Sequence, residues 1–599
     1  MNHSVKGLFA ALCSLMLLSP AASAAPLDEL ESLAGASPED YGRVFDKDLA
    51  SATLGSQPQM TQAQLKQLML SDLDSVRAMI AARYAPAGWK KDQYGWDLDA
   101  EIQKAKDQVN ASDSFGVKDY QRTLKTLLNS MKDYHVSVSF HSTEVALLPF
   151  SVTEAGGRYF ISAINRKAMP EALFPFQVGD ELTAFDGRPV AEVVAELKKQ
   201  AGVNNVPHTD VAMAVMMSLT TRGAMMGDAV PQGPVSISVW SAGAQEPAVY
   251  PMKWTYLPEY IAPQPFVTKS FGPRLPMDWL GTMMLETPYA YGADRASYGM
   301  GNKDGFLPDF GERLWTAPAE NSFRAYVYRS PASGRSIAYV RIPTYGVADP
   351  GKFVKDFAAL IPEFNLRADG LVIDQANNPG GIVLYLYSLA SMLTDRPLTL
   401  PKHYISLTQS DVAEAVKFLK DTAGAKTDED ARALLGPNVA GYPVDFELLK
   451  NWTAFYGETV KQWGAGRTIT SPLAIFGIAE VKPAAGRFAK PILILTNQLD
   501  FSGGDFFPAI MQDNKRAVVF GERTGGAGGV VKKYKRENNL LGVEAINLTA
   551  TIAERPDGQP IENLGVTPDL PYAVTPADVQ GGYAGYIKAA DAAVSGLIR

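Results

Sequence analysis

Cysteine is almost absent from this 599-residue chain, which has only Cys13. The segment around it has the pattern of a secretory signal, because Lys6 supplies positive charge and Leu8–Leu18 is apolar. Small residues at Ala22–Ala24 offer a cleavage site. We therefore expect residues 1–24 to be a signal peptide and the protein to be exported, either to the periplasm or out of the cell. The cleaved chain would have no cysteine, which excludes disulfides, thiolate nucleophiles and cysteine-bound metals.

Long apolar runs, excess basic charge and metal-binding patterns are also missing. No run after the signal segment approaches transmembrane length, so stable membrane insertion is not expected, with an uncleaved N-terminal anchor as the alternative. The net charge of −8 argues against a nucleic-acid partner. No cofactor or metal is expected, because no H-E-x-x-H pattern occurs. The histidines outside the signal segment are His135, His141, His208 and His403.

Hydrophobic residues make up 46% of the chain and charged residues 20%, which is typical of globular proteins. The spacing of hydrophobic residues changes along the chain from helical to strand-like and then alternates between the two. This change predicts a multidomain α/β protein. After the signal we expect a helical region at 25–145, a small β-rich module at 146–258, an irregular segment at 259–322 and an α/β core at 323–599. The core would contain a helical insertion at about 404–470.

His135 lies where the predicted structure changes from helix to strand. Leu124, Leu127, Leu128 and Met131 share one helical face, whereas Val136–Phe140 alternates apolar and polar residues as a strand does. A histidine at such a corner can be held firmly and still reach a cleft. The alternative is that His135 simply caps the end of the helix.

The β-rich module contains a run, Val178–Val190, that is similar to the Gly-Asp segment of PDZ domains. PDZ domains bind extended peptides by adding a strand to a sheet edge. A β-module without a ligand is the alternative. The irregular segment that follows is rich in Pro, Gly, Met and Tyr, and such stretches are often lids, linkers or removable segments.

Two glycines follow a buried strand in the core. The strand Gly370–Asp374 leads into Asn377–Gly381, and a helix then begins near Ile382. Backbone N–H groups at such a turn can bind an anion. No Gly-Lys-Ser/Thr follows, which argues against a nucleotide site, and an oxyanion hole is the other use of these groups.

Ser502 occupies a second strand–turn–helix. The apolar run Ile492–Leu495 precedes it, two glycines follow it, and Phe506–Met511 has helical spacing. A tight turn exposes the hydroxyl, and the start of the helix directs free N–H groups toward it. A serine that caps the helix requires the same local geometry, so the stretch alone permits both interpretations.

Three motifs together resemble the C-terminal-processing and tricorn-type serine peptidases. They are Asn377–Gly381, the turn at Ser502 and Ile561–Pro568. The resemblance extends from about residue 120 to the C-terminus and implies a ClpP/crotonase-like peptidase core. It also implies protein or peptide substrates, a zymogen that cleaves itself and a homodimer.

The resemblance assigns roles to individual residues. It implies that Ser502 is the nucleophile, that His135 is the general base and that Glu562 orients and charge-balances the histidine. The oxyanion N–H groups would come from Gly503, Gly380 and Gly381.

One position departs from the C-terminal-processing branch, whose lysine base falls at Ala527. Alanine cannot act as a base, so a Ser–His–Glu arrangement accounts for the sequence better than a Ser–Lys dyad. The sequence therefore predicts a serine endopeptidase that acts through an acyl-enzyme and is cleaved within about 260–320. The alternatives are a Ser–Lys tail-specific protease and a non-catalytic ligand- or peptide-binding protein on the same fold.

Overall fold

The computed structural model describes residues 60–200, 206, 208–259, 300–536 and 540–598. The chain divides into two compact units, Met1–Leu65 and Lys66–Arg599. Every element below belongs to the second unit, apart from the first turn of α3. The expected signal peptide with Cys13, and residues 260–299 of the irregular segment, lie outside the described residues.

The N-terminal region is helical, as the sequence predicts. Its last helix, α6, buries Leu124, Leu127 and Leu128 on one face, and Met131 just after it is also buried. α5 begins at an Asp97 cap, whose side chain accepts the Ala100 N–H at 3.0 Å. The helices are α3 (Gln62–Arg83), α4 (Ala87–Tyr94), α5 (Leu98–Asn110) and α6 (Val117–Asn129).

The strand predicted after His135 is β1 (Ser137–Phe140). Val136, Val138 and Phe140 are buried, which confirms the predicted alternation. β1 pairs antiparallel with β23 (Val543–Thr549), which pairs with β22 (Val531–Lys535). The corner that carries His135 is therefore fixed to the C-terminal part of the chain.

The β-rich module is a sheet with the strand order β3-β4-β5-β8-β9, and β6 pairs with β5 outside this order. An Asp-Gly turn lies within the PDZ-like run Val178–Val190, where Asp186 and Gly187 have φ values of 52° and 74°. The helix that follows this run is α7 (Val190–Gln200). The strands of this sheet are β3 (Phe150–Ala155), β4 (Arg158–Ile164), β5 (Glu181–Phe185), β6 (Arg188–Pro189), β8 (Pro234–Trp240) and β9 (Ala248–Lys253), and a second small sheet has β2 (Val145–Leu147), β7 (Thr221–Gly223) and β10 (Thr255–Leu257).

A seven-stranded sheet forms the centre of the α/β core. Strands β13 to β25 in its order run parallel, whereas β11 and β12 are antiparallel additions at one edge. The run Gly370–Asp374 forms β14, as predicted. In order the strands are β11 (Glu312–Thr316), β12 (Ala325–Arg329), β13 (Ser336–Arg341), β14, β20 (Ile492–Thr496), β21 (Val518–Gly521) and β25 (Leu570–Pro571).

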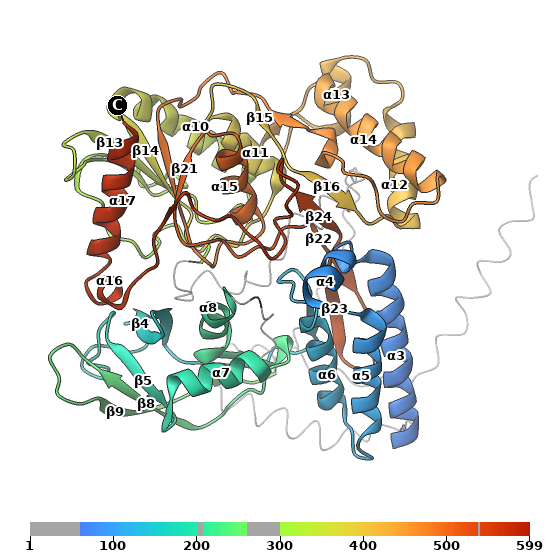
Figure 1. Ribbon diagram of the computed structural model, residues 1–599, viewed down its shortest axis with the longest axis vertical. Coiled ribbons are helices and arrows are strands. Elements are labelled where there is room, and N and C mark those ends of the chain that lie inside the picture. Colours follow the sequence, from blue (N-terminus) through green and yellow to red (C-terminus); the bar gives the residue numbers. More distant parts are fainter. Residues whose placement is uncertain (1–59, 201–205, 207, 260–299, 537–539, 599) are drawn as a thin grey trace, which may run out of the picture. The chain divides into compact units, whose positions relative to one another are not determined.

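Helices cover both faces of this sheet (Figure 1). α10 (Pro350–Arg367), α11 (Val383–Ser391) and α15 (Gly503–Asp513) pack on one face, and α17 (Ala584–Leu597) packs on the other. Both faces of β14 and β20 are therefore buried, as is typical of parallel sheets. Each fully buried aliphatic side chain there contributes about 1.5–3 kcal/mol to folding.

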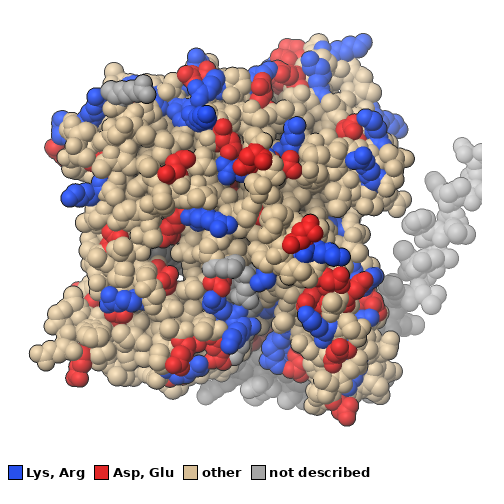
Figure 2. Space-filling view, in the orientation of Figure 1, with Lys and Arg blue, Asp and Glu red and all other residues tan. Residues whose placement is uncertain are grey.

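The predicted helical insertion is present and begins with a capping box. Thr408 and Asp411 form a capping box at the start of α12. The insertion contains α12 (Gln409–Thr422), α13 (Asp428–Leu435) and α14 (Phe446–Gly464). None of the helices in the described ranges combines the length and apolar character needed to cross a bilayer. Acidic and basic side chains are interspersed on the face shown in Figure 2.

Candidate active site

Ser502 has a strained backbone at the junction of β20 and α15. Its φ of 55° and ψ of −112° lie where a non-glycine residue is rarely found, at a cost of about 1–3 kcal/mol. Ser502 occupies the N-cap position, but its side chain forms no capping hydrogen bond. It is also the only residue from Phe501 to Met511 that is not buried. The geometry therefore presents the hydroxyl outward and does not use it to cap the helix.

A buried carboxylate ties the serine turn to the glycine turn on the neighbouring strand. Asp500 accepts the Asn378 N–H at 2.8 Å and the Asn497 N–H at 3.0 Å. Phe501 N–H donates to Asn378 O at 2.9 Å. The turns follow β20 and β14, which are adjacent parallel strands, so both lie at the carboxyl edge of the sheet.

The glycine turn lies directly against Ser502. A Cβ atom on Gly380 would lie 2.6 Å from each of Gly503 N, Phe501 O and Ser502 Cβ. A Cβ atom on Gly503 would lie 3.3 Å from Gly381 N. Only glycine permits this approach, because the backbones themselves are in contact.

The three predicted oxyanion donors are not equivalent. The Gly380 N–H donates to Asn378 Oδ1 at 2.8 Å, so the structure does not leave it free for a substrate. The N–H groups of Gly381 and Gly503 form no hydrogen bond within the described part of the chain. These two groups lie beside the serine and could bind a negatively charged oxygen.

His135 is fixed by the carboxylate of Asp133. Asp133 Oδ1 accepts the His135 backbone N–H at 2.9 Å, and Oδ2 accepts the hydroxyls of Tyr84 at 3.0 Å and Thr549 at 2.7 Å. The Tyr134 ring contacts the Phe501 ring edge-on, with centroids 5.1 Å apart. Since these rings immediately precede His135 and Ser502, the contact brings the predicted base and nucleophile into one neighbourhood.

The imidazole of His135 is suited to accept a proton. Burial lowers its pKa, nearby Asp133 opposes that shift, and Lys90 adds to it. The ring is therefore neutral at pH 7. Its Nδ1 atom is buried and has no hydrogen-bond partner among the described residues.

Glu562 is buried close to this corner but is held by other groups. Its Oε1 accepts a hydrogen bond from Lys90 Nζ, and its Oε2 accepts the Gly528 N–H at 3.1 Å. The structure therefore does not join Glu562 to His135 by a hydrogen bond. Burial and the Asp133 carboxylate raise the pKa of Glu562, whereas Lys90 and the Gly528 N–H oppose the rise.

Ala527 lies in a tightly packed turn. It stands where the C-terminal-processing branch has its lysine base, and alanine cannot act as a base. Its side chain is buried, and its N–H donates to Asp505 Oδ2 at 3.0 Å. Lys532 and Lys533, further along the chain, pair with Asp411 and Glu544.

The PDZ-like module contacts this region. His208 Nε2 donates to Thr524 O at 2.7 Å, and the hydroxyls of Tyr134 and Thr209 hydrogen-bond to each other. Burial lowers the pKa of His208 to about 4, so the ring is a neutral donor at pH 7. The module is thereby attached to the loop that follows β21.

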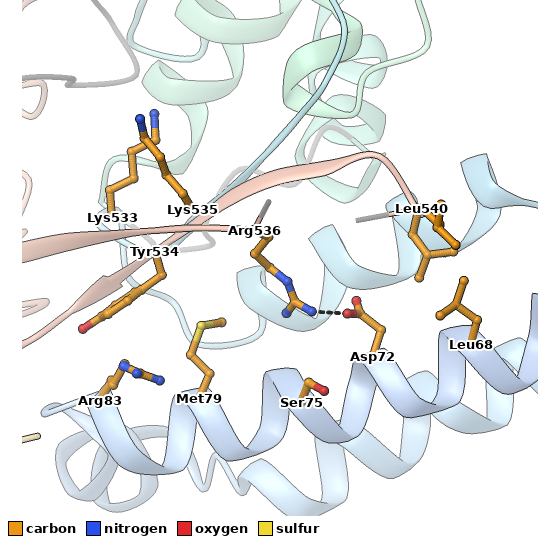
Figure 3. Close-up of a pocket in the computed structure, with 11 residues that line it drawn as sticks. Leu68, Asp72, Ser75, Met79, Arg83, Lys533, Tyr534, Lys535, Arg536 and Leu540 are labelled. Carbon is orange, nitrogen blue, oxygen red and sulfur yellow. Dashed lines mark hydrogen bonds and ion pairs between the residues drawn. The ribbon is translucent and has the colours of Figure 1, made fainter. Parts of the chain in front are cut away.

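A separate hollow lies between α3 and β22 (Figure 3). Arg536 pairs there with Asp72, and the Arg83 guanidinium lies 4.8 Å from the centre of the Tyr534 ring. Ser75, which also lines the hollow, donates its hydroxyl to Ser71 O at 3.1 Å. Among the described residues, no three His, Cys, Asp or Glu side chains are grouped as a metal site.

Sequence reasoning did not identify Lys90 as part of this region. Lys90 is buried whereas its neighbour Lys91 is exposed, and nothing in the sequence distinguishes them. Only the contacts of α4 with residues far along the chain show the difference.

Known proteins share these features. Residues 144–262 match the PDZ domain family, and residues 336–572 match peptidase family S41. A protein of Chlamydia trachomatis is 34% identical over 87% of this chain and 91% of its own. An uncharacterized protein of Chlamydia muridarum is 33% identical over 88% of this chain and 92% of its own.

Solved structures agree with the sequence matches. The crystal structure of mature CPAF, the chlamydial protease-like activity factor, has a TM-score of 0.77 and 32% identity, covering 89% of this chain and 98% of that one. A structure of mature CPAF complexed with lactacystin gives the same TM-score. The chain therefore belongs to peptidase family S41, that of the C-terminal-processing and tricorn-type peptidases, and is a relative of CPAF.

Proposed function

We propose that this protein is an exported serine endopeptidase that hydrolyses protein or peptide bonds through a Ser502–His135–Glu562 triad. The observation that carries the proposal is the geometry of Ser502. Its hydroxyl is presented on a strained turn, does not cap α15 and lies beside the N–H groups of Gly381 and Gly503, which form no hydrogen bond with any described residue.

The chemistry follows from these positions. His135 takes the proton of the Ser502 hydroxyl as its oxygen attacks the substrate carbonyl carbon, and the developing oxyanion is stabilised by the N–H groups of Gly381 and Gly503. The C–N bond then breaks, and the imidazolium gives its proton to the departing amine. Water repeats the sequence on the acyl-enzyme and releases the acid.

Glu562 serves as the orienting acid in this proposal, although it hydrogen-bonds to Lys90 and Gly528 in the structure. Its carboxylate oxygens have further lone pairs for the His135 Nδ1–H. An ionised acid at this place stabilises the imidazolium that forms during catalysis.

The proposal includes self-processing and dimerisation. We expect cleavage within about 260–320, which N-terminal sequencing of the fragments will show, and a homodimer by light scattering. The PDZ-like module favours peptide substrates, because PDZ domains bind extended peptides. His208 of this module contacts the loop beside the candidate active site.

A fluorophosphonate probe tests the nucleophile directly. We expect wild-type protein to be labelled and to cleave casein, and Ser502→Ala to do neither. His135→Ala should lower kcat by about four orders of magnitude. Equal labelling of Ser502→Ala would overturn the proposal. If His135→Ala stays active while a lysine variant loses activity, the Ser–Lys mechanism is restored.

A further inference from the structure

Lys90 is a buried cation at the centre of a hydrogen-bond network. The Lys90 and Glu562 side chains are 0% and 1% exposed. Lys90 Nζ donates to Glu562 Oε1, to Asn563 Oδ1 at 2.6 Å and to Lys132 O at 2.9 Å. An ammonium group has three N–H donors, so all of them are used.

This network joins the turn of the predicted acid to the corner of the predicted base. Asn563 Nδ2 also donates to Lys132 O, at 2.7 Å, three residues before His135. Trp89 Nε1 donates to Asn563 Oδ1 at 3.2 Å, so two successive residues of α4 hold this turn. A displacement of Lys90 would therefore move both the acid and the histidine's corner.

The charges at this site also require a cation. Asp133 and Glu562 are both buried carboxylates, and a buried charge is costly unless it is paired. With Lys90 the three side chains have a net charge of −1, which a proton on His135 brings to zero. The other titratable groups that face Glu562 are Tyr84 and Tyr94, and burial raises the pKa of each.

We propose that Lys90 is a positioning residue of the active site, which favours the ionised form of Glu562 and fixes it against the histidine's corner. Each carboxylate oxygen of Glu562 accepts one hydrogen bond in the structure and retains room for a second, from His135 Nδ1–H. The inference rests on the proposed Ser–His–Glu mechanism.

Lys90→Met tests this role by removing the charge while keeping most of the side-chain volume. We expect kcat for a fluorogenic peptide to fall about 100-fold or more, with KM unchanged. The acidic limb of the kcat/KM profile should move to higher pH by about one unit or more, because Glu562 then binds a proton more readily. An unchanged acidic limb would overturn the inference.

Lys125→Met is the matched control. It breaks another buried ion pair, Lys125–Asp228, with an N–O distance of 3.0 Å and side chains 10% and 7% exposed. We expect it to lower the unfolding temperature but to keep the wild-type pH profile. If it shifts the profile as Lys90→Met does, a general loss of stability explains both variants and the inference fails.

A double-mutant cycle with Glu562→Gln covers the case in which Lys90→Met does not fold. The double variant loses one positive and one negative charge together, so the net charge of the site stays as in the wild type. If Lys90 acts through Glu562, its kcat should be within about threefold of Glu562→Gln alone. A further 100-fold loss would overturn the inference. Failure of the wild-type protein to label at Ser502 would instead refute the proposed function.

Discussion

Replacing Gly380 by alanine introduces a methyl group between the two turns that flank Ser502. Gly380 has a φ of +89°, and an added Cβ would lie 2.6 Å from Gly503 N, Phe501 O and Ser502 Cβ. Two of these atoms are backbone atoms, so no side chain can rotate away. One of the two turns must move.

The expected effect can be estimated from this geometry. The positive φ alone costs about 1–2 kcal/mol of stability in a residue with a side chain. Moving catalytic groups by about 1 Å lowers the rate about 100-fold, which is about 3 kcal/mol of transition-state stabilisation. We therefore expect kcat of Gly380→Ala to fall about 100-fold.

Gly466→Ala separates the two contributions. Gly466 has a φ of +78°, but no atom lies within 4 Å of an added Cβ. Urea unfolding should show a loss of stability in both variants, larger for Gly380→Ala because of its clash, whereas only Gly380→Ala should lose kcat in a peptide assay and react slowly with a fluorophosphonate. Equal kcat values for the two variants would refute the close approach of the two turns.

Two further predictions concern the proposed base, His135, and the buried carboxylate of Asp505. Because burial lowers the pKa of His135 below the ordinary 6.5, the acidic limb of kcat/KM for Glu562→Gln, in which the acid no longer titrates, should lie below pH 6.5; a limb above 7 in this variant would contradict a buried neutral imidazole. Asp505→Asn should destabilise the protein by about 1–3 kcal/mol in urea unfolding. Asp505 Oδ1 accepts hydrogen bonds from Thr524 and Gly526, and Oδ2 accepts the Ala527 N–H at 3.0 Å. If the amide oxygen of the new side chain keeps the first two bonds, its amide nitrogen faces the Ala527 N–H, which then loses its acceptor. If Asp505→Asn is as stable as the wild-type protein, the turn at Ala527 does not depend on this carboxylate.

The sequence predicts the elements of the core well, because their signals are local. β14 coincides with the predicted run Gly370–Asp374, since a parallel strand buried on both faces is a continuous apolar run. The predicted helical insertion likewise begins with a local signal, the capping box that Thr408 and Asp411 form at α12. Such patterns depend only on residues within one or two turns of each other.

The details of the site depend on contacts that no local pattern reveals. The strand–turn–helix suggests Ser502, but only the structure shows that its side chain caps nothing. The two glycines suggest N–H donors, but the Asn378 side chain decides which N–H is used up. Lys90 could not be predicted, because its acceptors lie up to 473 residues away.

The pairing of β1 with β23 has a consequence for biosynthesis. Ser137 is in register with Asn547, so the strand after His135 acquires its sheet partner only when more than nine-tenths of the chain has been made. Contacts this distant in sequence form slowly. An incomplete chain emerging from the ribosome lacks this support, and we expect it to have no peptidase activity. Proteolysis would thus begin only after synthesis is nearly complete.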